Sequence, residues 1–277
     1  MLAAIPSGYY STLNGKKDAQ LKTAAYEIVH NFTKVSSYTA LPDYFRQTDV
    51  YPNSNLWWDM YSDIPLYTNS FKGLNREHSF PKSWWGGSTS VSAYVDLNHL
   101  YPSEAAANQA KSNYPLGMVD RNSGKPFDNG ISVVGYPVNG QGGGAQKVFE
   151  PADEYKGDFA RTYFYMVTCY QNLSWKYTYM VSQNLYPTLN QWSIDLLMDW
   201  HRHDPVSQKE IDRNEQVYKI QNNRNPFIDL PELAEYLWGT RKGEAFTPGT
   251  VVVPPTGDPV LTAPVSGMDL DFGQVAL

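Results

Sequence analysis

The chain has 277 residues, of which 42% are apolar and 18% charged, a balance typical of a globular protein and not of a disordered or collagen-like chain. No apolar run approaches the roughly 18 residues of a membrane span, and the single cysteine excludes an internal disulfide and a multi-cysteine zinc site. The 22 basic and 28 acidic residues give a net charge of −6, which on a simple reading argues against a polyanionic partner.

Apolar residues at three- or four-residue spacing predict helices, and short alternating runs predict strands. In chain order we expect a helix over residues 21–32, strands over 74–80 and 94–101, a short helix between Pro102 and Pro115, and a strand over 131–134. Helices are then expected over 159–170, around 194–198, after Pro205 through 211–220, and over 230–238 with Asp229 as its N-cap and Gly239 at its end. The fold class is therefore α+β, a mostly helical domain with small β-sheets.

The composition changes near residue 242. We expect the main domain to span 1–242, a Pro/Gly/Thr-rich linker to span 243–264, and residues 265–277 to be a tail or the start of a truncated β-rich domain. Residues 243–277 hold four acidic residues and no Lys or Arg, which leaves a net charge of −2 on residues 1–242. A domain this close to neutrality can hold a local basic cleft.

Two segments combine residue types that bind metals and move protons. The first, residues 75–87, contains Glu77 and His78 on a predicted strand, and the second, residues 96–117, places Asn108 on the predicted short helix. Carboxylate and amide oxygens are hard ligands suited to Mg²⁺, and a neutral imidazole can deprotonate water. This set matches what a one-metal phosphodiesterase site requires. Neighbouring residues on a regular strand point to opposite faces, so both can serve one site only if the strand ends or bends there.

The same segments carry a family resemblance. The runs REHSFPKSWW (76–85), DLNHLYP (96–102), SNYPLG (112–117), KGDFARTYFYM (156–166) and WHRHDPV (200–206), with RNE and QNNRNPFI further on, follow one another in order. Over roughly residues 5–240 the chain resembles the bacterial endonuclease I family of extracellular or periplasmic nucleases, which have a ββα-metal (His-Me finger) site. Some members of that family carry several disulfides, which the single cysteine forbids here.

The resemblance implies a role for each matching residue. His78 would be the general base, and Glu77 and Asn108 would bind one divalent ion, with Mg²⁺ first and Mn²⁺ or Ca²⁺ as alternatives. The reaction would be sequence-nonspecific cleavage of DNA, with RNA as an open alternative, leaving 5′-phosphate ends. The segment between base and helix has no arginine to match a catalytic arginine that some members use, so Arg161 and Arg76 are the candidates for the cation at the phosphate. The protein would be secreted or periplasmic, with any export signal already removed.

Further residues near these motifs are candidate contacts. Lys82, Lys111 and Trp84 are expected to bind nucleic acid, the tryptophan by stacking on bases. His99, Asn98 and Glu104 are expected to support the site. The alternatives are a non-catalytic, aromatic-rich module that binds nucleic acid or glycan, and a metal-dependent hydrolase of another phosphoester.

Overall fold

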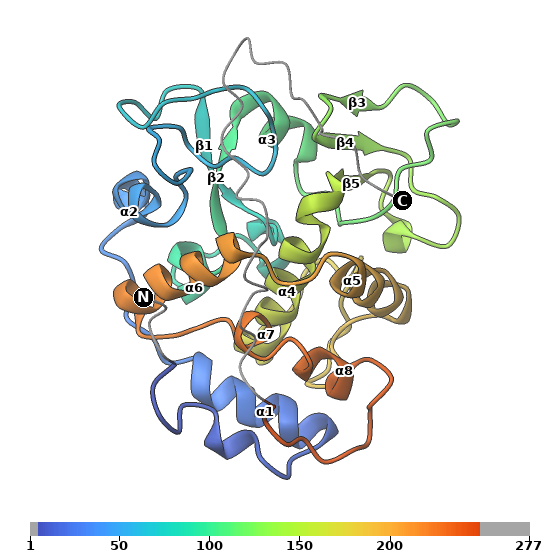
Figure 1. Cartoon of the computed structure of the whole chain (residues 1–277). Helices are drawn as coiled ribbons and strands as arrows, with labels where there is room; N and C mark the ends of the chain where they lie inside the picture. Colours follow the sequence, from blue (N-terminus) through green and yellow to red (C-terminus); the bar gives the residue numbers. More distant parts are fainter. Residues whose placement is uncertain (1–4, 250–277) are drawn as a thin grey trace, which may run out of the picture.

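The computed structural model describes residues 5–249. Helix α4 (Asp153–Cys169) runs through the middle of the molecule and packs against α5 (Gln191–His203), α1 (Asp18–Val29) and α7 (Pro226–Asp229) (Figure 1). Almost every side chain of α4 is buried, including its aromatic residues, so this helix forms the centre of the main hydrophobic core. The remaining helices are α2 (Leu41–Thr48), α6 (Gln208–Gln221) and α8 (Leu233–Leu237).

The described strands form two small antiparallel sheets. In the first, β1 (Leu74–His78) pairs with β2 (Leu100–Glu104), and α3 (Ala105–Lys111) follows β2 directly and packs against both strands (Figure 1). The second sheet has the order β3 (Phe127–Asp128), β4 (Ser132–Gly135) and β5 (Val148–Pro151). The predicted α+β class is confirmed.

The strand–strand–helix unit is fixed by a second, smaller core. Leu74 on β1 and Leu100 on β2 pack there against Phe45 of α2 and Val217 of α6, all buried. Short 3-10 helices complete the surroundings of this unit: η2 (Tyr38–Ala40), η3 (Lys82–Trp85) and η4 (Ser92–Val95). The first sheet is thus anchored to helices that come from both ends of the described chain.

Several predicted boundaries were wrong. Residues 94–99 are not a strand: η4 ends at Val95 and β2 starts only at Leu100. Pro102 lies within β2. In this two-stranded sheet both strands are edge strands, so the missing N–H of proline is tolerated. Helix α3 therefore starts later than predicted, with Glu104 as its N-cap. Asp229 ends α7 and does not cap the next helix, because its carboxylate binds Arg224.

Helix α6 takes part in several buried ion pairs, three of which connect it to different parts of the chain. Its Glu210 binds Arg161 of α4, its Arg213 binds Asp49 just after α2, and its Glu215 binds Arg224. The nitrogen–oxygen distances are 2.5, 2.8 and 2.5 Å. A capping box between Ser207 and Glu210 fixes the start of this helix.

The predicted C-terminal linker and tail lie partly beyond the described residues. Residues 250–264 of the predicted linker and the predicted tail over 265–277 lie outside them. Phe246 is described and is fully buried, with backbone hydrogen bonds to residues 15 and 16. Within residues 5–249, no helix has the length and apolar character needed to cross a membrane.

Candidate active site

Strand β1 ends at the two residues that the sequence singled out. Glu77 and His78 are its last residues, and the backbone N–H of Ser79 continues the register one step further by donating to the carbonyl of His99 at 3.1 Å. The two side chains have different neighbours, as strand alternation requires. Glu77 contacts α3, whereas His78 contacts η4.

Glu77 and Asn108 lie together. The Asn108 side-chain amide donates to Oε2 of Glu77 at 2.5 Å, and Lys111 Nζ lies 2.7 Å from Oε1. Asn108 and Lys111 are three residues apart on α3 and so share one face of the helix. Burial raises the pKa of Glu77, and the positive charge of Lys111 opposes that shift.

The contact between Lys111 and Glu77 is an ion pair without hydrogen-bond alignment. Lys111 Nζ and Glu77 Oε1 lie 2.7 Å apart, and within the described part of the chain neither atom has another polar partner. The geometry leaves an Oε1 lone pair available in a buried environment.

The donor set around Glu77 fits a divalent cation that keeps most of its water. Residues 5–249 contain no group of three or more His, Cys, Asp or Glu arranged to hold a metal ion. A site here would use the Glu77 carboxylate and the Asn108 amide oxygen. The Asn108 side-chain amide faces Glu77 with its nitrogen, and a half-turn of that amide would bring its oxygen to the same place. Two hard oxygen donors completed by water and substrate phosphate match the coordination of Mg²⁺.

His78 is held in one tautomer. Its Nε2 lies 3.1 Å from the carbonyl oxygen of Tyr94, which can only accept, so Nε2 carries the proton and Nδ1 is left as the free acceptor. The ring stacks nearly parallel to Tyr38 and Tyr94 and meets Trp85 edge-on. Burial lowers the pKa of His78 well below its usual value, with smaller contributions from His99 and Lys82. The ring is therefore neutral near pH 7.

Two cations flank this aromatic group. The Arg76 guanidinium lies over the Tyr38 ring, 5.1 Å from its centroid, and the Lys82 ammonium lies over Tyr94 at 5.5 Å. Both side chains belong to partly exposed residues, and among residues 5–249 neither forms an ion pair. Their charge is therefore free to meet an anion beside His78.

Sequence reasoning did not single out Tyr38 or Tyr94. Tyr38 comes from η2, forty residues before His78, and no local pattern connects the two. Tyr94 lies in the sequence between the two motifs, and this position was the one indication that it could be near the site.

Three predicted contacts lie inside the protein. Arg161 is fully buried and binds both oxygens of Glu210, at 2.5 and 2.8 Å, so it does not line the site. Lys111 is equally buried against Glu77. Trp84 is buried as well, with its indole N–H donated to the Asn113 carbonyl, and offers no ring face to a base.

The predicted supporting residues occupy structural positions next to the site. Glu104 accepts hydrogen bonds from the N–H groups of Ala106 and Ala107 and so fixes the start of the helix that carries Asn108. Asn98 is buried and binds Asn223 at 3.2 Å. His99 is fully buried, and its ring lies 5.4 Å from that of His78.

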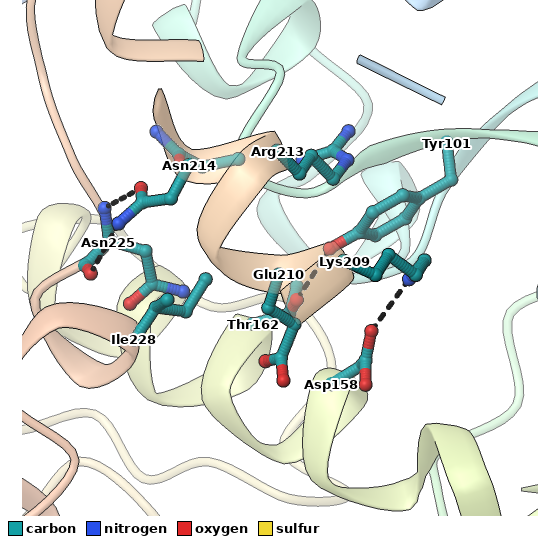
Figure 2. A pocket seen from close by; sticks show the side chains of 10 residues that line it. Tyr101, Asp158, Thr162, Lys209, Glu210, Arg213, Asn214, Asn225 and Ile228 are labelled. Atoms are coloured by element: carbon teal, nitrogen blue, oxygen red, sulfur yellow. Dashed lines mark hydrogen bonds and ion pairs between the residues drawn. The ribbon is translucent and has the colours of Figure 1, made fainter. Parts of the chain in front are cut away.

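A separate polar cavity lies between α4 and α6 (Figure 2). Tyr101, Asp158, Thr162 and Lys209 are among its lining residues, and Lys209 Nζ binds Asp158 at 2.6 Å. Its volume is about 10 Å³, which is room for one water molecule and not for a nucleotide. This cavity is not a substrate site.

Comparison with known proteins matches most of the chain to one family. The family described as Endonuclease I matches residues 17–232. An extracellular ribonuclease of Bacillus amyloliquefaciens is 33% identical over 247 residues, covering 83% of this chain and 78% of that protein. An extracellular ribonuclease of Bacillus subtilis (strain 168) is 32% identical over 255 residues, with the same coverage. Endonuclease-1 of Buchnera aphidicola is 26% identical over 133 residues, covering 48% of this chain and 44% of that protein.

Proposed function

Because the chain belongs to the endonuclease I family and is a nuclease, we propose that it is a divalent-metal-dependent endonuclease that cuts nucleic acids without sequence preference. The observation that carries the proposal is the arrangement at the end of β1. There, a neutral His78 with a free Nδ1 is next in sequence to the Glu77–Asn108 oxygen pair, and the two tyrosine rings beside it carry two cations that form no ion pair among residues 5–249.

His78 would act as the general base. Its Nδ1 takes a proton from a water molecule, whose oxygen attacks phosphorus as the bond from phosphorus to the 3′-oxygen breaks. The Tyr94 carbonyl keeps the other ring nitrogen protonated and stabilises the imidazolium that forms. The products would be a 5′-phosphate and a 3′-hydroxyl that gains its proton from solvent.

Glu77 and Asn108 would hold the metal. A bound divalent ion would supply charge stabilisation for the departing 3′-oxygen, as in other metal-assisted phosphodiester hydrolysis. Lys111 would keep the Glu77 carboxylate ionised and oriented from behind. Mg²⁺ is the first candidate because both donors are hard oxygens.

The substrate would be bound through its backbone. Arg76 and Lys82, which lie over the two tyrosine rings beside His78, would contact phosphates there, and phosphate contacts carry no sequence information. Two relatives are named ribonucleases and one Endonuclease-1, so we propose that both RNA and DNA are cut. The names of the two Bacillus proteins also support export from the cell.

The test is cleavage of supercoiled plasmid and of a single-stranded RNA, with Mg²⁺ and with EDTA. We expect both substrates to be cut, EDTA to stop the reaction, and His78→Ala to lower the rate by a factor of about 10²–10⁴. His203→Ala is the matched control, since His203 is exposed at the end of α5 and should leave the rate unchanged.

Each outcome of this experiment tests one part of the proposed function. Full activity of His78→Ala would refute the assignment of His78 as the general base, and cleavage in EDTA would refute the metal dependence. Absence of cleavage with Mg²⁺, Mn²⁺ and Ca²⁺ would favour the non-catalytic binding module.

A further inference from the structure

A single turn holds the two neighbouring histidines. In η4, the carbonyl oxygen of Ala93 accepts from His99 Nε2 at 2.7 Å, and the next carbonyl, that of Tyr94, accepts from His78 Nε2 at 3.1 Å. The two carbonyls belong to adjacent peptide units that share the Cα of Tyr94 within one short 3-10 helix, so a shift of one displaces the other. Any displacement of Ala93 is therefore passed to the atom that orients His78.

His99 also fixes the backbone on the other side of His78. Its carbonyl oxygen accepts two hydrogen bonds from Ser79, from the N–H at 3.1 Å and from the hydroxyl at 2.9 Å. Ser79 is fully buried and follows His78 directly. One residue thus sets both the chain position of His78 and the place of its hydrogen-bond acceptor.

The position of His99 is fixed in turn from the core. Its backbone N–H donates to the carbonyl of Asp96 at 3.3 Å. The Asp96 carboxylate accepts from the hydroxyls of Tyr165 and Tyr170, both on or next to α4, at 2.8 and 2.7 Å. The segment that carries His99 is therefore tied to the central helix.

His99 does not act on the substrate itself. It is fully buried, and its Nδ1 has no hydrogen-bond partner among residues 5–249. Burial lowers the pKa of His99 to about 4, so the ring is neutral and donates its one proton, on Nε2, to Ala93. Its side chain makes that one hydrogen bond and packs against the rings of His78 and Trp85.

We propose that His99 is a positioning residue for the catalytic base: it holds η4 and the end of β1 so that His78 stays in the Nε2-protonated tautomer with Nδ1 free. The proposal rests on the proposed role of His78. Misplacing a catalytic group by about 1 Å costs on the order of 10²-fold in rate. Loss of the His99 side chain should therefore lower kcat and leave KM nearly unchanged, since no substrate contact is removed.

The test compares two substitutions of His99 with the same two at another buried histidine. His99→Leu removes the donor to Ala93, whereas His99→Gln keeps a side-chain N–H that reaches a similar place. His201 is the control, because it is also buried and also hydrogen-bonds a backbone carbonyl through Nε2, that of Pro231 at 3.0 Å. It lies on α5, outside the segments that contact His78. Activity and the ¹⁵N chemical shifts of the His78 ring, which report its tautomer, are measured for all four variants.

For His99→Leu we expect kcat to fall by a factor of about 10–10² with KM within twofold, and the His78 ring to become a mixture of tautomers. His99→Gln should recover most of kcat and the single tautomer. His201→Leu and His201→Gln should change neither, even where stability falls. Wild-type kcat in His99→Leu, or a lowered kcat with an unchanged His78 tautomer, would overturn the proposal.

A second variant covers the case in which His99→Leu does not fold. Ser79→Ala removes only the hydroxyl bond to the His99 carbonyl and keeps the backbone bond, so the sheet edge stays intact. We expect a several-fold lower kcat at unchanged KM, and an unchanged kcat would count against the proposal. Full activity of His78→Ala would instead remove the proposed function, while the tautomer measurement on His99→Leu would still report whether His99 orients the ring.

Discussion

The ion pair between Glu77 and Lys111 makes stability and activity separable. Glu77→Gln keeps the shape of the side chain but leaves the Lys111 ammonium without its counter-charge, in a position where the lysine side chain is 0% exposed. Removing one partner of a buried pair costs about 3–5 kcal/mol of unfolding free energy. Lys111→Met should cost a similar amount, because it leaves a buried carboxylate.

The double variant distinguishes the two roles of Glu77. With Glu77→Gln and Lys111→Met combined, no net charge is left buried, so stability should return to within about 1–2 kcal/mol of wild type. Cleavage should stay lost, because the carboxylate that would bind the metal is absent. Urea unfolding and plasmid cleavage are measured on the four proteins of the cycle. Additive losses of stability would refute the ion-pair reasoning, and recovered cleavage would refute Glu77 as a metal ligand.

Three further expectations follow from other charged side chains. Lys22 is fully buried with only neutral acceptors, and burial lowers its pKa from 10.5 to about 7, so the unfolded chain binds more protons between these pH values and wild-type stability rises across that window. Lys22→Met removes the cost of deprotonating the buried lysine, roughly 4 kcal/mol at pH 7, but leaves two buried acceptors without a hydrogen bond. The free energy of unfolding at pH 7 should therefore rise by about 1–3 kcal/mol, and in urea unfolding this gain should vanish towards pH 10.5. A difference that stays constant with pH would contradict this. Arg161→Met should cost about 3–5 kcal/mol of stability through its pair with Glu210 and leave kcat of the folded protein unchanged; a lowered kcat would return Arg161 to the active site. Lys82→Ala and Arg76→Gln should each weaken nucleic-acid binding and reduce the slope of log Kd against log salt by about 1, as seen in binding titrations with the His78→Ala protein; an unchanged slope would remove the phosphate contact.

The periodic parts of the sequence predicted the fold well. Phe159, Tyr163 and Met166 predicted the central helix because their spacing follows the helical period. The structure also buries nearly all the other side chains of this helix. The predicted strand over 94–101 was misplaced for a tertiary reason. The carbonyls of Ala93 and Tyr94 bind histidine side chains from other segments and not a neighbouring strand, which no local alternation reveals.

The candidate site was predictable where it depends on motifs and not where it depends on packing. Glu77 and Asn108, expected together from the family resemblance, do lie in contact. Lys111 was predicted to bind nucleic acid and Arg161 to be the cation at the phosphate, but each meets a buried carboxylate from a distant part of the chain. Tyr38 was missed because only the fold brings it beside His78.

Three ion pairs of α6, those of Glu210, Arg213 and Glu215, bear on how the domain unfolds. They connect this helix to α4, to the segment after α2 and to the chain before α7, so the departure of any one of these parts would strand a buried charge. Separation of α6 from any of these three parts is therefore costly, and we expect them to open together. In hydrogen exchange, the slowest-exchanging amides of α4 and α6 should therefore exchange through one common unfolding event.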